Sequence, residues 1–250
     1  MSGHSKWAQI KRQKGVNDAR RGQLFTKLGR EITVAAREGG PDPNGNFRLR
    51  LAIQKARQNN MPMENIERAI KRGAGSGEGS ESWEQVFYEG YGPGGVAILV
   101  QALTDNRNRT TSEIRSIFTR SGGSLGEAGS VAWIFDQRGQ VIIDLAGRDP
   151  DEVQLEAIDA GAEDVIQEGN ELIVYTRLED LNQVRQELEK SDYTIIGAEL
   201  TMLPKTQIEL DEHQAEQVLR LIDRLEELDD VQQVYSNYAI SDELLERMAG

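Results

Sequence analysis

Residues 141–176 read VIIDLAGRDPDEVQLEAIDAGAEDVIQEGNELIVYT, in which β-rich apolar runs flank one amphipathic acidic run. Short runs bounded by Gly, Asn or Asp are typical of strands, and apolar residues at helical spacing are typical of a helix. With the residues that follow, the stretch predicts a strand, a helix, two strands, a helix and a strand, at Val141–Leu145, Pro150–Ala160, Ala162–Gln167, Glu171–Thr176, Leu178–Lys190 and Tyr193–Leu200. That order, βαββαβ, is the ferredoxin-like arrangement.

The segments on either side of this unit supply a second set of similar elements. Residues 83–135 predict strands with one helix, and residues 206–238 predict a strand, a helix and a strand. These elements are expected at Val86–Glu89, Val96–Leu103, from Thr110 or Thr111 as the cap to Arg120, and at Val131–Phe135, Gln207–Leu210, Glu212–Glu227 and Val231–Ser236. Joined, the two segments make a discontinuous ferredoxin-like domain, into which residues 139–203 are inserted.

The first part of the chain predicts a separate helical domain. Apolar residues recur at three- and four-residue spacing over about 19–38, with Asp18 as the N-cap. A second helix is expected from Asn44–Asn46 to about Asn59, and a third follows Pro62, whose missing N–H costs nothing in a first turn. The apolar stripe of the third helix consists of Met63, Ile66 and Ile70.

A glycine-rich stretch separates the helical part from the rest. Residues 73–80 read GAGSGEGS, a composition that favours a linker over regular structure. The predicted fold class is therefore α+β, with a helical N-terminal domain and two ferredoxin-like α/β domains, one inserted into the other. The expected bounds are 1–72 for the basic helical domain with its flexible N-terminal tail, 83–135 with 206–238 for the discontinuous domain, and 139–203 for the inserted one.

Charge is divided unevenly along the chain. Residues 1–72 contain sixteen Lys and Arg against six Asp and Glu, a net charge of +10, whereas the remaining residues contain thirteen against thirty-six, a net charge of −23. The total of −13 and a pI near 4.8 would by themselves argue against a nucleic-acid partner. Because a polyanion responds to the local field, the segregation instead favours a nucleic acid that contacts the basic end while the acidic remainder stays clear of it.

Composition excludes several other classes of protein. The absence of Cys excludes disulfides and thiolate metal sites, and the two histidines, His4 and His213, cannot build a multi-histidine metal site. No run approaches the roughly 20 apolar residues of a membrane span. No residue pattern supports a nucleophile or an acid–base pair. We expect a cytoplasmic protein that is not an enzyme, with no cofactor, no metal, no membrane partner and no small-molecule substrate.

The basic segment at the start of the chain holds a tryptophan among its cations. Binding to phosphates needs positive side chains, and an aromatic ring adds stacking on bases. The candidate nucleic-acid-binding residues of the helical domain are Lys6, Trp7, Lys11, Arg12, Lys14, Arg20, Arg21, Lys27, Arg30, Arg68, Lys71 and Arg72. The alternative is a solvated cationic tail without a specific partner, together with charges that keep helix faces soluble.

Arg107 and Arg109 form a second candidate site within the acidic part. They lie in the segment DNRNRTT at 105–111, between a predicted strand and a predicted helix. Arginines at the start of a helix can bind phosphate or RNA. The alternative is an ordinary polar loop in which a threonine caps the helix.

Several long motifs in residues 3–131 are more specific than any of these patterns. They read GHSKW at 3–7, DARRG at 18–22, FTKL at 25–28, NMP at 60–62, RAIKRG at 68–73, YEGYGPGG at 88–95, LTDNRNRT at 103–110 and GGSLG at 122–126. With these motifs the chain resembles the YebC/PmpR family. The resemblance implies a helical domain followed by two ferredoxin-like domains. It also implies regulation of transcription through DNA binding, while a mitochondrial branch of the family activates translation and bacterial relatives act on ribosomes stalled at proline-rich stretches.

Three functions remain open at this point. The first is a DNA-binding transcriptional regulator that acts through the basic domain. The second is a translation factor that binds ribosomal or other RNA, where shape and stacking dominate recognition. The third is a protein–protein adaptor that uses the acidic ferredoxin-like surfaces and has no use for the basic tail.

Overall fold

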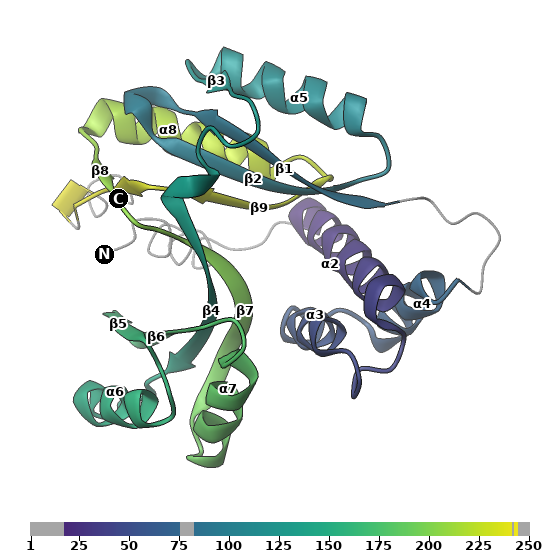
Figure 1. Ribbon diagram of the computed structural model, residues 1–250, viewed down its shortest axis with the longest axis vertical. Coiled ribbons are helices and arrows are strands. Elements are labelled where there is room, and N and C mark those ends of the chain that lie inside the picture. Colours follow the sequence, from purple (N-terminus) through teal and green to yellow (C-terminus); the bar gives the residue numbers. More distant parts are fainter. Residues whose placement is uncertain (1–17, 76–82, 242, 245–250) are drawn as a thin grey trace. The chain divides into compact units, whose positions relative to one another are not determined.

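The computed structural model describes residues 18–75, 83–241, 243 and 244. It divides into two compact units, one made of Met1–Phe135 with Pro204–Gly250 and the other of Asp136–Leu203. The predicted flexible tail and most of the predicted linker lie outside the described residues. The predicted fold class is confirmed, because a helical region is followed by two antiparallel sheets that carry helices (Figure 1).

Among the described residues, three helices form the N-terminal part of the first unit: α2 (Asp18–Gly39), α3 (Phe47–Gln58) and α4 (Met63–Gly73). Asn46 joins two of them. Its Oδ1 accepts from the backbone N–H of Leu49 at 3.0 Å and so caps α3, while its Nδ2 donates to the carbonyl of Ala35 in α2 at 2.7 Å. The helices bury a shared core that includes Leu28, Ile32, Leu49, Ala52, Ala56 and Ile66.

The C-terminal end of α4 packs tightly against α2. A Cβ atom on Gly73 would lie 2.3 Å from the carbonyl oxygen of Thr33. The buried face of α4 therefore runs through Ile66, Ala69 and Gly73. The predicted stripe was wrong for Met63, which is 47% exposed because it lies in the first turn, at the opposite end from this close approach.

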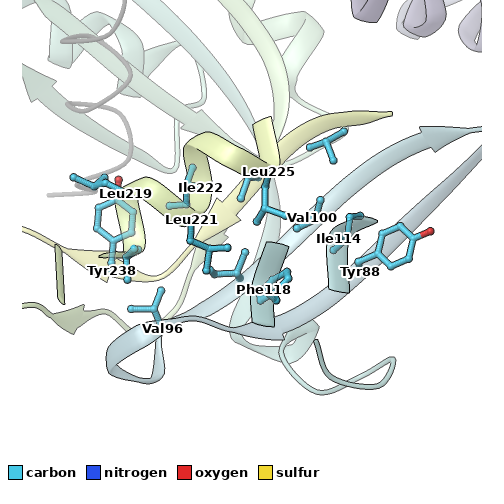
Figure 2. Close-up of a cluster of buried hydrophobic side chains, with 14 of the residues drawn as sticks. Tyr88, Val96, Val100, Ile114, Phe118, Leu219, Leu221, Ile222, Leu225 and Tyr238 are labelled. Atoms are coloured by element: carbon cyan, nitrogen blue, oxygen red, sulfur yellow. The ribbon is translucent and has the colours of Figure 1, made fainter. Parts of the chain in front are cut away.

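A four-stranded antiparallel sheet forms the rest of the first unit, in the order β3-β1-β2-β9. Helices α5 and α8 cover one face of it (Figure 1). The strands are β1 (Glu84–Tyr91), β2 (Ala97–Thr104), β3 (Ser124–Leu125) and β9 (Val231–Ser236), and the helices are α5 (Arg107–Arg120) and α8 (Glu212–Glu226). Figure 2 shows their apolar side chains meeting in one cluster, with Phe118 and Leu221 among the buried members.

One predicted strand in this unit was wrong, and another is shorter than predicted. Residues Ala132–Ile134 form a short 3-10 turn, and β3 takes the place at the edge of the sheet. The strand predicted at 207–210 shrinks to β8 (Ile208–Glu209), which pairs in parallel with β10 (Tyr238–Ala239) outside the main sheet. The cap of α5 was also wrong, because the side chain of Asn106, and not a threonine, accepts from the N–H of Arg109.

Glu89 explains why the residues before Phe135 do not form a strand. Its carboxylate, on β1, accepts hydrogen bonds from the backbone N–H groups of Gly129, Val131 and Ala132, each at 2.7 Å. These donors would otherwise be available to a sheet partner. Burial would raise the pKa of Glu89, but the three N–H donors stabilise the carboxylate and bring its pKa below the ordinary value.

We therefore expect Glu89→Gln to destabilise the protein by about 1–2 kcal/mol at neutral pH, because an amide accepts these bonds less strongly and presents an unpaired NH2 group. The lowered pKa means that the contribution is complete above the unfolded value near 4.5 and is lost as the pH falls through the folded value. Urea denaturation between neutral and acidic pH measures both effects. Glu127→Gln, an exposed carboxylate in the same loop, is the control, and an equal loss in the two variants would contradict this role.

The second unit has the predicted βαββαβ order. Its sheet order is β5-β6-β4-β7, the ferredoxin-like order, with two helices between strands. The elements are β4 (Phe135–Asp144), α6 (Pro150–Asp159), β5 (Asp164–Glu168), β6 (Glu171–Thr176), α7 (Leu181–Lys190) and β7 (Thr194–Pro204). At the base of this unit, the backbone N–H of Lys205 donates to the carbonyl of Ile134 at 2.8 Å, so the departing and returning chains are bonded to each other.

Candidate nucleic-acid interface

The predicted binding residues are distributed over three regions. Lys6, Trp7, Lys11, Arg12 and Lys14 lie outside the described residues. For Arg20 and Arg21 the structure gives only their backbone position, near the start of α2. The others are Lys27 and Arg30 on α2, Arg68, Lys71 and Arg72 on α4, and Arg107 and Arg109 on the first turn of α5.

Three of these arginines meet around a hollow on the helical domain, between α2 and α4, which pack side by side (Figure 1). The hollow has a volume of about 420 Å³. We call it the arginine hollow. Its lining residues are Phe25, Thr26, Gly29 and Arg30 from α2, Met61 from the turn before α4, and Asn65, Arg68, Ala69 and Arg72 from α4.

The α4 side of the arginine hollow follows directly from helical spacing. Asn65, Arg68 and Arg72 are separated by three and four residues, so they share one face of the helix. Arg68 has a largely exposed side chain and an ion pair with Glu64 at 3.2 Å, an exposed pair of a kind that contributes little. Within the described part of the chain, Arg72 has no ion-pair partner. Both guanidinium groups can therefore reach a ligand at modest cost.

The α2 side combines an aromatic ring with an opening. Phe25 is half-buried, packs against the helical core and lines the arginine hollow. Gly29 follows it by one helical turn and has no side chain to fill the space above Met61, whose Cε would lie 3.7 Å from a Cβ at this position. The wall between the two arginine-bearing faces is therefore apolar, with Met61 and Ala69 buried in it.

Arg30 belongs to the arginine hollow but its charge is already neutralised. Its guanidinium lies 4.4 Å from the centre of the Trp83 ring and 2.9 Å from Oδ1 of Asp230. It also donates to the carbonyl of Asp229 at 2.6 Å. Arg30 is therefore held in place from outside the helical domain, and we do not count it among the cations available to a ligand.

Asp230 is the centre of this arrangement. Its buried Oδ2 accepts from Arg109 at 2.8 Å, from Thr110 at 2.6 Å and from Thr104 at 3.3 Å. Burial would raise the pKa of Asp230, but hydrogen bonds from Thr110 and Arg109 and the charge of Arg30 bring it below the ordinary value. The hydrogen bond to Asp230, followed by the one to Asp105 at 2.8 Å, raises the pKa of Arg109.

Three of the predicted binding residues are already engaged by other groups of the protein. Lys27 and Arg30 were predicted to bind nucleic acid, yet Lys27 donates to the carbonyl of Glu226 at the end of α8, and Arg30 binds Asp230. Arg109 is likewise engaged by carboxylates of its own unit. We therefore leave Lys27, Arg30 and Arg109 out of the proposed interface. Arg107 is exposed, and its role stays a prediction.

The family model for the TACO1/YebC N-terminal domain matches residues 5–76, and that for the TACO1/YebC second and third domain matches residues 83–238. The chain belongs to the TACO1/YebC family. The helical domain that carries the arginine hollow corresponds to the first of these matches.

Named TACO1/YebC relatives are similar over nearly their full length. A probable transcriptional regulatory protein of Chloroflexus aggregans is 59% identical over 250 residues, which cover 99% of each chain. One from Dehalococcoides mccartyi is 56% identical, over 99% of this chain and 98% of the relative. A crystal structure of a conserved hypothetical protein from Aquifex aeolicus is 51% identical and has a TM-score of 0.85, covering 91% of this chain and 94% of the other.

Among the described residues, no three His, Asp or Glu side chains lie close enough together to hold a metal ion. None of the described helices combines the length and the apolar composition that crossing a bilayer requires. The candidate binding site of the described residues is the arginine hollow.

Proposed function

We propose that this TACO1/YebC protein is a nucleic-acid-binding regulator of gene expression that acts through its basic helical domain. The observation that carries the proposal is the arginine hollow, which lies on the positively charged end of an otherwise acidic chain. Exposed Arg68 and Arg72 are suited to phosphate oxygens, because a guanidinium donates in a planar fork. Lys71 and the cations of residues 1–17 extend the same positive end in sequence.

The acidic part of the chain supports an oriented contact. Its net charge of −23 opposes approach of a polyanion, so the contact is confined to the basic end. Affinity that rests on phosphate contacts is also strongly dependent on salt. We therefore expect a regulator that binds in one orientation and weakens steeply with ionic strength.

The relatives' names favour DNA as the partner, because they describe probable transcriptional regulatory proteins. The alternative is a ribosome- or RNA-associated translation factor, and the apolar wall of the arginine hollow with Phe25 favours it, since exposed bases are more typical of RNA. An acidic protein–protein adaptor is a third possibility. Crosslinking in cells, with bound DNA and RNA sequenced in parallel, separates the first two. A cytoplasmic location is part of the proposal.

We expect the double variant Arg68→Ala with Arg72→Ala to bind nucleic acid about tenfold more weakly at low salt, because it removes two charge-assisted contacts. The slope of log affinity against log salt concentration should fall in magnitude by about 1.4–1.8. Fluorescence anisotropy over a salt series measures both quantities.

Arg220→Ala is the matched control for this experiment. Arg220 is as exposed as Arg68 and also pairs with a glutamate one turn away, Glu216, but it lies on α8 in the acidic part. We expect its affinity and salt slope to equal those of the unmodified protein. Equal behaviour of the two sets of variants would refute the role of α4, and an adaptor would show no binding in any of them.

A further inference from the structure

We propose that the arginine hollow binds one unpaired nucleotide of a single-stranded nucleic acid, with the base in the hollow and the neighbouring phosphates on Arg68 and Arg72. This inference rests on the proposed function and adds the form of nucleic acid that the site selects. A volume of about 420 Å³ falls within the range of small-ligand pockets.

The lining of the hollow has apolar and polar surface, and the base of a nucleotide likewise has apolar faces and a polar edge. Phe25, Met61 and Ala69 supply apolar surface, and a base presents two apolar faces that stack on aromatic rings. The side-chain amide of Asn65 adds a donor and an acceptor beside that surface, suited to the polar edge of a base. A phosphate alone would use none of these groups.

The positions of the two exposed arginines fit phosphates on either side of such a base. Arg68 and Arg72 lie on neighbouring turns of α4 at the exposed edge of the hollow. Arg30, on the opposite side, is neutralised by Asp230 and stacked on Trp83, so it contributes its stem to the wall and not a third charge. The site is therefore cationic along one edge and apolar inside.

A duplex cannot use this arrangement fully. Its bases are stacked within the helix, and its outer surface offers phosphates and the edges of bases in the grooves. Only a base that leaves the stack, as in a loop, a bulge or a single strand, can enter a hollow. The apolar interior thus predicts a preference for unpaired nucleotides over paired ones.

The test fills the hollow without changing the charge. Gly29→Leu places a side chain into it from α2, and Gly22→Leu is the matched control, because a Cβ at Gly22 on the same helix meets no atom within 4 Å. The full-length proteins are titrated with labelled strands of about 12 nucleotides. The probes are oligothymidylate, oligouridylate, an abasic strand with the same phosphates and a duplex of the same length.

The unmodified protein and Gly22→Leu should bind at least one base-bearing single strand about tenfold more tightly than the abasic strand, because stacking of a base adds affinity. Gly29→Leu should lose this difference and keep its affinity for the abasic strand. A preference for the uridylate or the thymidylate strand identifies RNA or DNA as the source of the nucleotide and supports the inference in either case.

Two results would overturn the inference while leaving the proposed function intact. The first is equal binding of abasic and base-bearing strands by the unmodified protein, which needs no variant and so does not depend on folding of Gly29→Leu. The second is an unchanged preference in a folded Gly29→Leu protein. Absence of binding to every probe, duplex included, would instead remove the proposed function and this inference with it.

Discussion

Asp230→Ala is expected to lower the free energy of unfolding by about 3 kcal/mol, the lower end of the cost of removing one partner from a buried ion pair. The carboxylate is almost completely buried and accepts from two arginines and two threonines. Its loss leaves Thr104 and Thr110 with fewer partners in a buried setting. Arg30 and Arg109 keep part of their exposure and can regain water, which is why the upper end of the range is not expected.

The pH dependence of stability gives a second measurement of the same group. Because the folded pKa of Asp230 is lowered, its contribution is complete above the ordinary value near 3.8 and is lost as the pH falls through the folded value. Stability curves of the unmodified protein and of Asp230→Ala should therefore converge in acid. Asp229→Ala removes the exposed neighbouring carboxylate and should cost far less. A similar cost at both positions would show that Asp230 is not the centre of the contact.

Gly73→Ala should destabilise the helical domain by about 1–3 kcal/mol, the usual cost of overpacking. The direction is informative, since Gly→Ala within a helix ordinarily stabilises by up to about 1 kcal/mol. Here the new Cβ would lie 2.3 Å from the carbonyl oxygen of Thr33 and 2.8 Å from the Cβ of Ala36. The first of these is backbone and cannot rotate away, so α4 has to move off α2 and the arginine hollow changes shape with it.

Gly22→Ala is the control for this substitution. It makes the same chemical change on α2, where a Cβ meets nothing within 4 Å, and should be neutral or stabilising. Denaturation followed by circular dichroism compares the two variants. Equal melting of both would contradict the close approach of α4 to α2.

Local chemistry made much of the fold predictable. Residues 141–176 carry strand and helix signals that agree with each other, and the structure has β4, α6, β5 and β6 there. The failure at Val131–Phe135 has a different origin. Its residues favour a strand, but Glu89 on a distant part of the chain takes up the N–H groups that a strand would need. A contact between residues that are distant in the chain cannot be predicted from the local sequence pattern.

Only the charged residues of the candidate site could be predicted from the sequence. Charge along the sequence pointed to Arg68 and Arg72, and the structure places both beside one hollow. The sequence pattern could not distinguish these two arginines from Arg30, because the carboxylate partner of Arg30 lies 200 residues away in the chain. Phe25 and Gly29 were missed as site residues because an apolar ring and a glycine at helical spacing normally indicate packing. Their one-turn separation from each other and the position of Asn65 on the arginine face of α4 are the signals that were available.

The hydrogen bond between Lys205 and Ile134 affects how the host domain tolerates changes in the inserted unit. It holds the two ends of the inserted unit next to each other. For the host domain, residues 136–203 therefore connect two neighbouring points of the chain, as a short loop would. Exchanging that unit for a shorter or longer module alters loop-closure entropy only slowly with length. We therefore expect a change in the length of the inserted unit to alter the stability of the host fold only weakly.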